Sequence, residues 1–219
     1  MKIALIIIGA LALVGVAAMA VFVYVVQNVE QPAYRVVEQE DALEVRDYPA
    51  LVVAEVRRQG ARKEALSAGF GPLARYIFAK ERDGEKISMT APVEQQRTDT
   101  IAMTVPVTQT RLDDGDWSVR FIMPAQYQLG QLPAPATKDV RLIEVPARRS
   151  AAIRFSGVAD DALIAAKEAE LRAWMAARSL VPAAAPVFAY YNDPFTPGFL
   201  RRNEVIIDLA DAPAPVAAP

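Results

Sequence analysis

The sequence predicts an α+β fold: a mainly antiparallel, barrel-like sheet with two flanking helices and two similar halves. In each half, strand-like segments accompany one amphipathic segment, without the βαβ alternation of parallel sheets. The halves also share a pattern at an offset of 97 residues, in which Asp47-Tyr48-Pro49, Ala54, Val56-Arg57 and Gly60 correspond to Glu144-Val145-Pro146, Ala151, Ile153-Arg154 and Gly157. A repeat of this kind predicts a pseudo-two-fold domain.

Residues 1–26 are predicted to anchor the chain in a membrane. Ile3–Val26 carries no charged residue, and as a helix it would extend about 36 Å, enough to cross a bilayer core. Lys2 is the flanking positive charge, which favours an N-in orientation in the inner (cytoplasmic) membrane with the soluble domain in the periplasm or outside. The alternative is a cleaved signal peptide, because Ala18-Met19-Ala20 resembles a cleavage site. The apolar run continues past that site, which favours an uncleaved anchor.

The main domain is expected over residues 34–209, after a polar linker at 27–33. Strands are expected at Tyr34–Val37, Ala42–Arg46 and Ala50–Arg58. A helix is expected at Ala61–Arg82, because its apolar residues recur at steps of three and four. Gly69, Gly71 and Pro72 interrupt this helix and predict a kink or a tight contact there.

A five-residue sequence motif occurs twice after the first helix. Met89-Thr90-Ala91-Pro92-Val93 returns as Met103-Thr104-Val105-Pro106-Val107. We expect an antiparallel hairpin whose turn is the polar run Glu94–Thr100, with each proline ending a run of ladder hydrogen bonds. The strand Trp117–Met123 and the Pro-rich connection Leu132–Ala136 complete the first half.

The second half is predicted to begin near Val140. Asp160 and Asp161 suit the N-terminus of a helix over Asp160–Arg178, where they complement the free N–H groups and the dipole. Strands are expected at Val187–Tyr191 and Glu204–Leu209. The Ala/Pro-rich tail, residues 210–219, is expected to be disordered.

Composition excludes several classes of function. Lys plus Arg is 24 against 26 for Asp plus Glu, a balance that argues against a nucleic-acid partner. The chain has no cysteine and no histidine. These absences exclude thiolate chemistry, a Ser-His-Asp mechanism and a proximal histidine for haem. No catalytic residue and no metal site is predicted, and the chain is not expected to be an enzyme.

Several segments together resemble the SOUL haem-binding family, over about Tyr34–Leu209. They are Glu44–Pro49, Glu64–Leu66, Ala74–Ile77, Lys86–Val93, Phe121–Pro124, Leu132–Pro135, Phe155–Gly157 and Arg201–Glu204. The resemblance implies a distorted eight-stranded antiparallel barrel with two flanking helices and two similar halves, and a porphyrin site in a hydrophobic cleft beside the first helix. It implies contacts from Phe70, Leu73 and Ala74, a propionate partner in Arg75, and Met89 and Met103 reaching the cleft.

Simpler roles exist for each of these residues. Phe70 and Leu73 also suit an ordinary core, Arg75 a surface charge, and the methionines gap-filling. The function expected is non-catalytic binding of haem or another tetrapyrrole, for carriage, buffering or sensing. The alternatives are a ligand-free structural domain or an effector-binding module for hydrophobic or cationic molecules. The last would need acidic residues in its cleft, and Glu55, Glu94 and Glu204 are candidates, although a solvated strand edge is the simpler expectation for each.

Overall fold

The computed structural model describes residues 9–10, 13–15, 17, 29–97 and 116–210. Within them, nine strands form one antiparallel sheet in the order β1-β2-β7-β9-β8-β4-β5-β3-β6. Two long helices accompany the sheet, which confirms the α+β class. The elements are β1 (Arg35–Glu40), β2 (Leu43–Tyr48), β3 (Leu51–Arg58), α2 (Arg62–Ile77), β4 (Val93–Arg97), β5 (Trp117–Ile122), η1 (Leu129–Gln131), β6 (Arg141–Val145), β7 (Arg148–Phe155), α3 (Asp161–Ala177), β8 (Val187–Tyr190), η2 (Gly198–Leu200) and β9 (Asn203–Asp208). The expected number of eight strands is wrong, because β1 adds an extra strand beside β2.

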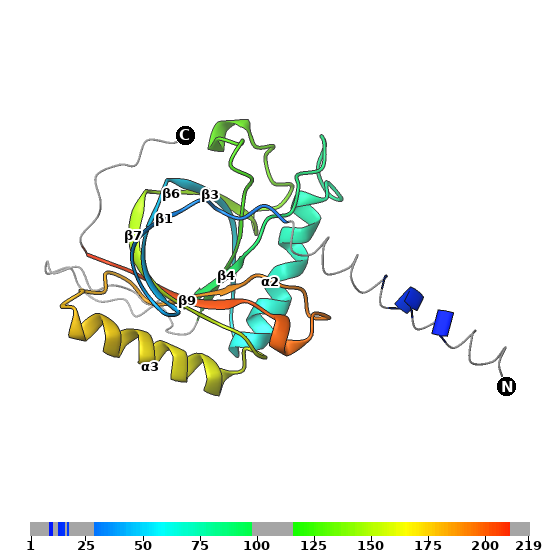
Figure 1. The fold of residues 1–219 in the computed structure, drawn as a ribbon. Coiled ribbons are helices and arrows are strands. Elements are labelled where there is room, and N and C mark those ends of the chain that lie inside the picture. The colour runs from blue at the N-terminus through cyan, green and yellow to red at the C-terminus, as the bar shows by residue number, and fades with distance from the viewer. Residues whose placement is uncertain (1–8, 11–12, 16, 18–28, 98–115, 211–219) are drawn as a thin grey trace, which may run out of the picture.

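Two short corners close the sheet on itself. Tyr48 pairs with Arg148 in the β2–β7 ladder, and Leu51 pairs with Val145 in the β3–β6 ladder. The register therefore continues across Pro49-Ala50 on one chain segment and Pro146-Ala147 on the other. Because proline cannot donate to a ladder, each corner falls where a break in pairing costs least. Figure 1 shows the resulting barrel viewed along its opening.

The strand pairing obeys the two-fold relation expected from the repeat. Leu51 and Arg148 are 97 residues apart, and so are Tyr48 and Val145, so the shift converts one of these pairs into the other. Gly60 and Gly157 precede the two helices and have φ angles of 98° and 116°. Residues with a Cβ avoid that region, which explains why glycine stands at both positions.

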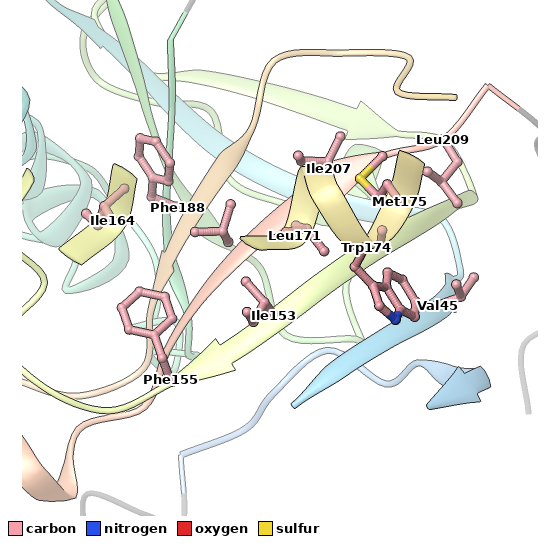
Figure 2. Packing of buried hydrophobic residues seen from close by; sticks show 12 residues of the cluster. Val45, Ile153, Phe155, Ile164, Leu171, Trp174, Met175, Phe188, Ile207 and Leu209 are labelled. Carbon is pink, nitrogen blue, oxygen red and sulfur yellow. The ribbon is translucent and has the colours of Figure 1, made fainter. Parts of the chain in front are cut away.

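Each helix packs against the outside of the barrel, α2 on β3 and β5 and α3 on β7 and β9. Under α3, a core of large apolar side chains fills the space to β7, β8 and β9, including Ile153, Leu171, Trp174 and Ile207 (Figure 2). A second core under α2 joins Leu73 and Ile77 to Ala54, Val56 and Val119. Side chains of a strand alternate between its two faces, so the residues between these positions point into the barrel.

Arg62 connects the N-terminal end of α2 to the N-terminal end of α3. Its guanidinium donates to Asp161 at 2.6 Å, to the hydroxyl of Tyr190 at 2.6 Å and to the carbonyl oxygen of Ala159 at 2.9 Å. The Gln95 side chain donates to the Arg62 carbonyl oxygen at 2.8 Å. One buried arginine of the first half is thus held by three groups of the second.

The region of the repeated motif differs from the expected hairpin. The first copy ends at Val93, the first residue of β4, and the polar residues after it continue this strand instead of forming a turn. Glu94 and Gln95 are both buried. The Glu94 side chain points into the barrel, and the Gln95 side chain donates to the backbone at the start of α2. The second copy, Met103–Val107, lies outside the described residues.

Helix α2 is five residues shorter at its C-terminal end than expected, and Gly69 is its point of closest approach to the sheet. A Cβ at Gly69 would lie 2.8 Å from both Cβ and Cγ2 of Val119. This confirms the tight contact expected from the glycines in the helix. A Cβ at Gly71 would instead meet only the flexible end of Arg75, at 3.4 Å.

We therefore expect Gly69→Ala to lower the free energy of unfolding by about 1–3 kcal/mol, because the branched Val119 side chain cannot move aside without repacking. Gly71→Ala is the matched control in the same helix. It should be neutral or stabilise by up to about 1 kcal/mol, since alanine favours the helix. Urea unfolding of both variants tests the contact, and equal effects would contradict it.

The predicted membrane anchor is not tested by the structure. In the part of the chain that is described, no helix combines the length and apolar character needed to span a bilayer. Most of Ile3–Val26 lies outside that part, as does nearly all of the Ala/Pro tail.

Candidate functional site

The exposed flank of α2 carries an apolar stripe. Leu66, Phe70, Ala74 and Phe78 recur at steps of four, so they lie along one side of the helix. Phe70 and Phe78 are 41% and 39% exposed, and the eight residue steps from one to the other span about 12 Å. Beneath the stripe, the ring of Phe70 packs edge-on against Phe121 of β5, with centroids 5.2 Å apart. The stripe thus leaves parts of two aromatic side chains exposed on the flank of α2.

Only part of the predicted site lies on this stripe. Phe70 and Ala74 belong to it, whereas Leu73 is fully buried and supports the helix from below. Met89 is half-buried and packs against the same core. Met103 lies outside the described residues.

Arg75 lies about 140° around the helix from Phe70, since the two are five residues apart. It forms an ion pair with Glu81 at 2.7 Å, and both side chains are nearly half exposed. With Tyr76, Arg82 and residues 135–137, Arg75 lines a pocket of about 20 Å³. That volume holds a water molecule, whereas pockets for drug-sized ligands measure roughly 300–1,000 Å³. This pocket is therefore too small to hold a tetrapyrrole.

The interior of the barrel is charged. Glu55, Glu94 and Glu204 are only 2%, 5% and 1% exposed, so the expected position at a solvated strand edge is wrong for all three. On its strand, each of these glutamates lies next to residues whose side chains pack under a helix. The glutamate side chains therefore point into the barrel. In the sequence, each of these glutamates stands beside apolar residues in a short predicted strand. A strand with one face in solvent has the same pattern, so the pattern does not distinguish a charged barrel interior from an exposed face.

Glu204 is fully neutralised by its surroundings. Its carboxylate accepts from Arg46 at 2.6 Å, from Arg202 at 2.7 Å and from the hydroxyl of Tyr191 at 3.0 Å. Burial opposes its ionisation, but the bonds from Arg46 and Arg202 outweigh burial and lower its pKa. The guanidinium of Arg46 also lies 4.3 Å from the centroid of the Tyr34 ring. Arg46 was not among the residues selected from sequence.

Glu55 is neutralised in the same way. It accepts from Ser118 at 2.7 Å and from Arg120 at 2.8 Å, and it also binds Arg141. Burial again opposes ionisation, and the Ser118 and Arg120 bonds outweigh it, so its pKa is lowered. Neither Glu55 nor Glu204 has charge left for a cationic ligand.

Glu94 is different. Burial raises its pKa, and the attraction of Arg148 and Arg120 only partly offsets burial. The nitrogen of Arg148 that faces it is 3.8 Å away, beyond hydrogen-bond distance. Arg148 bonds to Asp208 at 3.2 Å, and its Nη1 is buried without a hydrogen-bond partner. The Glu94–Arg148 pair is therefore the weakest part of the polar interior.

We expect Glu94→Gln to raise the free energy of unfolding at pH 7 by on the order of 1 kcal/mol, the scale of one poorly satisfied buried polar group. A carboxyl whose folded-state pKa is raised stabilises most below its unfolded pKa, and that stability is lost as pH rises through the folded pKa. The stability that Glu94→Gln gains over wild type should therefore vanish below about pH 4.5, the ordinary pKa of the carboxyl. Urea titrations across pH test this, with the exposed Glu81→Gln as control. A variant less stable than wild type at pH 7 would contradict the assignment.

The described domain matches the model of a known protein family. A family model described as "SOUL heme-binding protein" matches residues 29–208, which is nearly the whole described domain. The chain belongs to the SOUL haem-binding family. The family resemblance seen in the sequence is thereby confirmed. No curated protein matches the chain significantly.

Solved structures share the fold of this SOUL domain at low sequence identity. The C-terminal domain of EcmrR has a TM-score of 0.55 at 12% identity, covering 82% of this chain and 99% of that one. An uncharacterized conserved protein from Listeria innocua has a TM-score of 0.54 at 12% identity, with 78% and 93% covered. A hydrolase from Listeria innocua has a TM-score of 0.51 at 12% identity, with 80% and 94% covered. At such identities the likeness concerns the fold alone.

Proposed function

We propose that this SOUL-family chain binds haem or another tetrapyrrole noncovalently on the exposed flank of α2, for carriage, buffering or sensing, and catalyses no reaction on it. The observation that carries the proposal is the stripe of Phe70, Ala74 and Phe78, which leaves about two-fifths of two aromatic side chains open to solvent on one long helix of a SOUL-family domain. Leaving such rings exposed is costly unless something covers them.

The residues present fit a tetrapyrrole held by its faces and its carboxylates. Histidine and cysteine are absent from the chain, so neither imidazole nor thiolate holds the iron. Arg75 is exposed enough to exchange Glu81 for a propionate, with Arg82 at the same pocket. Met, Tyr and Lys are the other side chains that could hold the iron, and the stripe of Leu66, Phe70, Ala74 and Phe78 contains none of them. We therefore propose that binding rests on apolar contact and ion pairing, and that an iron-free porphyrin binds about as well as haem.

The proposed site of action is the outer face of the inner membrane. The uncharged segment Ile3–Val26 supports an anchor with the domain outside the cytoplasm. A reporter fused after Pro219 tests the orientation. Activity that requires export supports it, and a reporter active in the cytoplasm contradicts it.

Titration of residues 27–219 with hemin and with protoporphyrin tests the binding itself. We expect saturable changes in the porphyrin absorption spectrum with both compounds and similar affinities. A response to neither would overturn the proposal, and a response to hemin alone would overturn the metal-independent mode.

A second candidate is the binding of a lipophilic cation inside the barrel. Glu94 favours it, because this buried carboxyl has no cation within hydrogen-bond distance among its described ion pairs. A thermal-shift screen with lipophilic cations beside porphyrins separates the two candidates. Stabilisation by cations that disappears in Glu94→Gln would favour this second function over the first.

A further inference from the structure

The loop between β8 and β9, residues 191–202, presents the most exposed aromatic side chains of the described domain. Phe195 is 86% exposed and Phe199 is 78% exposed. Leu200 is 43% exposed, and Val158, which packs against Gly198 of the loop, is 57% exposed. These four exposed apolar residues are called the loop patch, and none of them belongs to the stripe on α2. The sequence signal was two phenylalanines within a turn rich in proline and glycine.

The loop patch is held in place by polar contacts within the loop. The Asp193 carboxylate accepts from the backbone N–H groups of Phe195 at 2.7 Å and Thr196 at 3.2 Å, and from the Thr196 hydroxyl at 2.8 Å. Arg201 donates to the carbonyl oxygens of Thr196 and Pro194, both at 2.7 Å. Gly157 N–H donates to the Gly198 carbonyl oxygen at 2.9 Å, which ties the loop to the start of α3. The phenylalanines are thus presented outward by an ordered loop.

The loop patch lies at the end of the barrel where the chain enters from its N-terminal segment. Arg202 donates to the Gln31 side chain at 2.9 Å, and Ala91 N–H donates to the Glu30 carbonyl oxygen at 2.9 Å. Val29 packs on an apolar cluster that includes Ala91 and Tyr191, the first residue of the loop. Figure 1 shows this loop, in orange, beside α2 on the side from which the chain enters.

Only Gln27 and Asn28 separate Val29 from the uncharged segment that ends at Val26. Three residue steps reach at most about 10 Å. If Ile3–Val26 lies in a bilayer, this end of the barrel is held against the membrane surface, and the loop patch is held there with it.

We propose that the loop patch inserts into the interfacial region of the bilayer that holds the N-terminal anchor. Aromatic side chains favour this region, where apolar bodies leave water without reaching the hydrocarbon centre. The charges around the patch are mixed, with Arg201 and Arg202 near Asp193 and Asp160, so insertion should occur on zwitterionic lipid. The proposal rests on the predicted anchor and is independent of tetrapyrrole binding.

The test uses the full chain, without tetrapyrrole, reconstituted in phosphatidylcholine vesicles with or without bromine on the acyl chains. Phe195→Trp and Phe199→Trp each add an indole to the native Trp117 and Trp174, whose signal is subtracted with wild type. We expect bromolipid to quench both added indoles. Val181→Trp is the matched control, since Val181 is an apolar residue, 62% exposed, beyond the opposite end of β9. Its indole should remain unquenched.

A second substitution measures the strength of docking. Phe199→Ser in the Phe195→Trp chain should shift the ratio of docked to undocked domain by about tenfold or more, since burying one phenylalanine side chain is worth at least that. Quenching would fall accordingly. Indoles at 195 and 199 that are quenched no more than the one at 181 would overturn the proposal and leave the patch to a protein partner. A chain that does not remain with the vesicles would overturn it at the first step.

Discussion

Replacing Arg46 with methionine is expected to lower the free energy of unfolding by about 3–5 kcal/mol, the scale of breaking a buried ion pair, because Glu204 would keep only Arg202 and Tyr191 as partners. Arg46 and Glu204 have fully buried side chains and are joined at 2.6 Å. The guanidinium also donates to Glu44 at 2.6 Å and to the Tyr48 hydroxyl at 3.1 Å. Methionine fills similar space but provides none of these bonds. Urea unfolding of the domain measures the loss.

An exposed pair gives the matched control for this substitution. Arg172 and Glu168 are four residues apart on α3 and joined at 2.7 Å, with 43% and 26% of their side chains exposed. Arg172→Met should cost less than about 0.5 kcal/mol, because water and salt screen such pairs. The double variant Arg46→Met/Glu204→Gln should recover part of the loss, since it removes both charges. Equal effects of Arg46→Met and Arg172→Met would contradict a stabilising role for the barrel interior.

The cost of Arg46→Met should also depend on pH. Glu204 has a lowered pKa in the folded state, so its contribution is present above its unfolded pKa, about 4.5, and is lost as pH falls through the folded pKa. Arg46 causes part of that lowering. The difference between wild type and variant should therefore be largest near neutral pH and shrink below about pH 4.5.

These polar contacts mark the limit of what the sequence predicted. The 97-residue repeat, the two helices and most of the strands were predicted, because they follow from apolar periodicity and from glycine and proline at fixed places. Strand β4 was assigned to a turn, because Glu94, Gln95 and Gln96 leave it no apolar alternation. Polar side chains are stable there since the barrel interior supplies partners from strands far away in sequence, which a single segment does not reveal.

The candidate site shows the same division. The α2 residues were predicted as a set because helical spacing places them near one another, but helical spacing alone did not separate buried Leu73 from exposed Phe70. The difference depends on where β5 lies beneath the helix. The buried position of Arg62 was also not predicted, because its partners Asp161 and Tyr190 lie about a hundred residues further along the chain.

The second large effect concerns ligand binding and depends on the difference between Phe70 and Leu73. We expect Phe70→Ser to weaken the binding of hemin and of protoporphyrin by about three- to eightfold, because covering the exposed 41% of this side chain contributes roughly 0.6–1.2 kcal/mol. The folded domain should survive, since Phe70 is 41% exposed and its removal opens no closed cavity. Absorption titrations of residues 27–219 measure both affinities.

Two comparison variants separate this site from general adhesion of porphyrin to apolar surface. Phe199→Ser removes an aromatic ring that is more exposed than Phe70 but lies in the β8–β9 loop, and it should change either affinity less than about twofold if α2 is the site. Arg75→Gln should weaken both porphyrins only severalfold, the scale of one exposed ion pair. A loss in Phe199→Ser that equals the loss in Phe70→Ser would move the site off α2. If Phe70→Ser had no effect while wild type bound saturably, the ligand would have to lie elsewhere, and the interior beside Glu94 would be the next place to test.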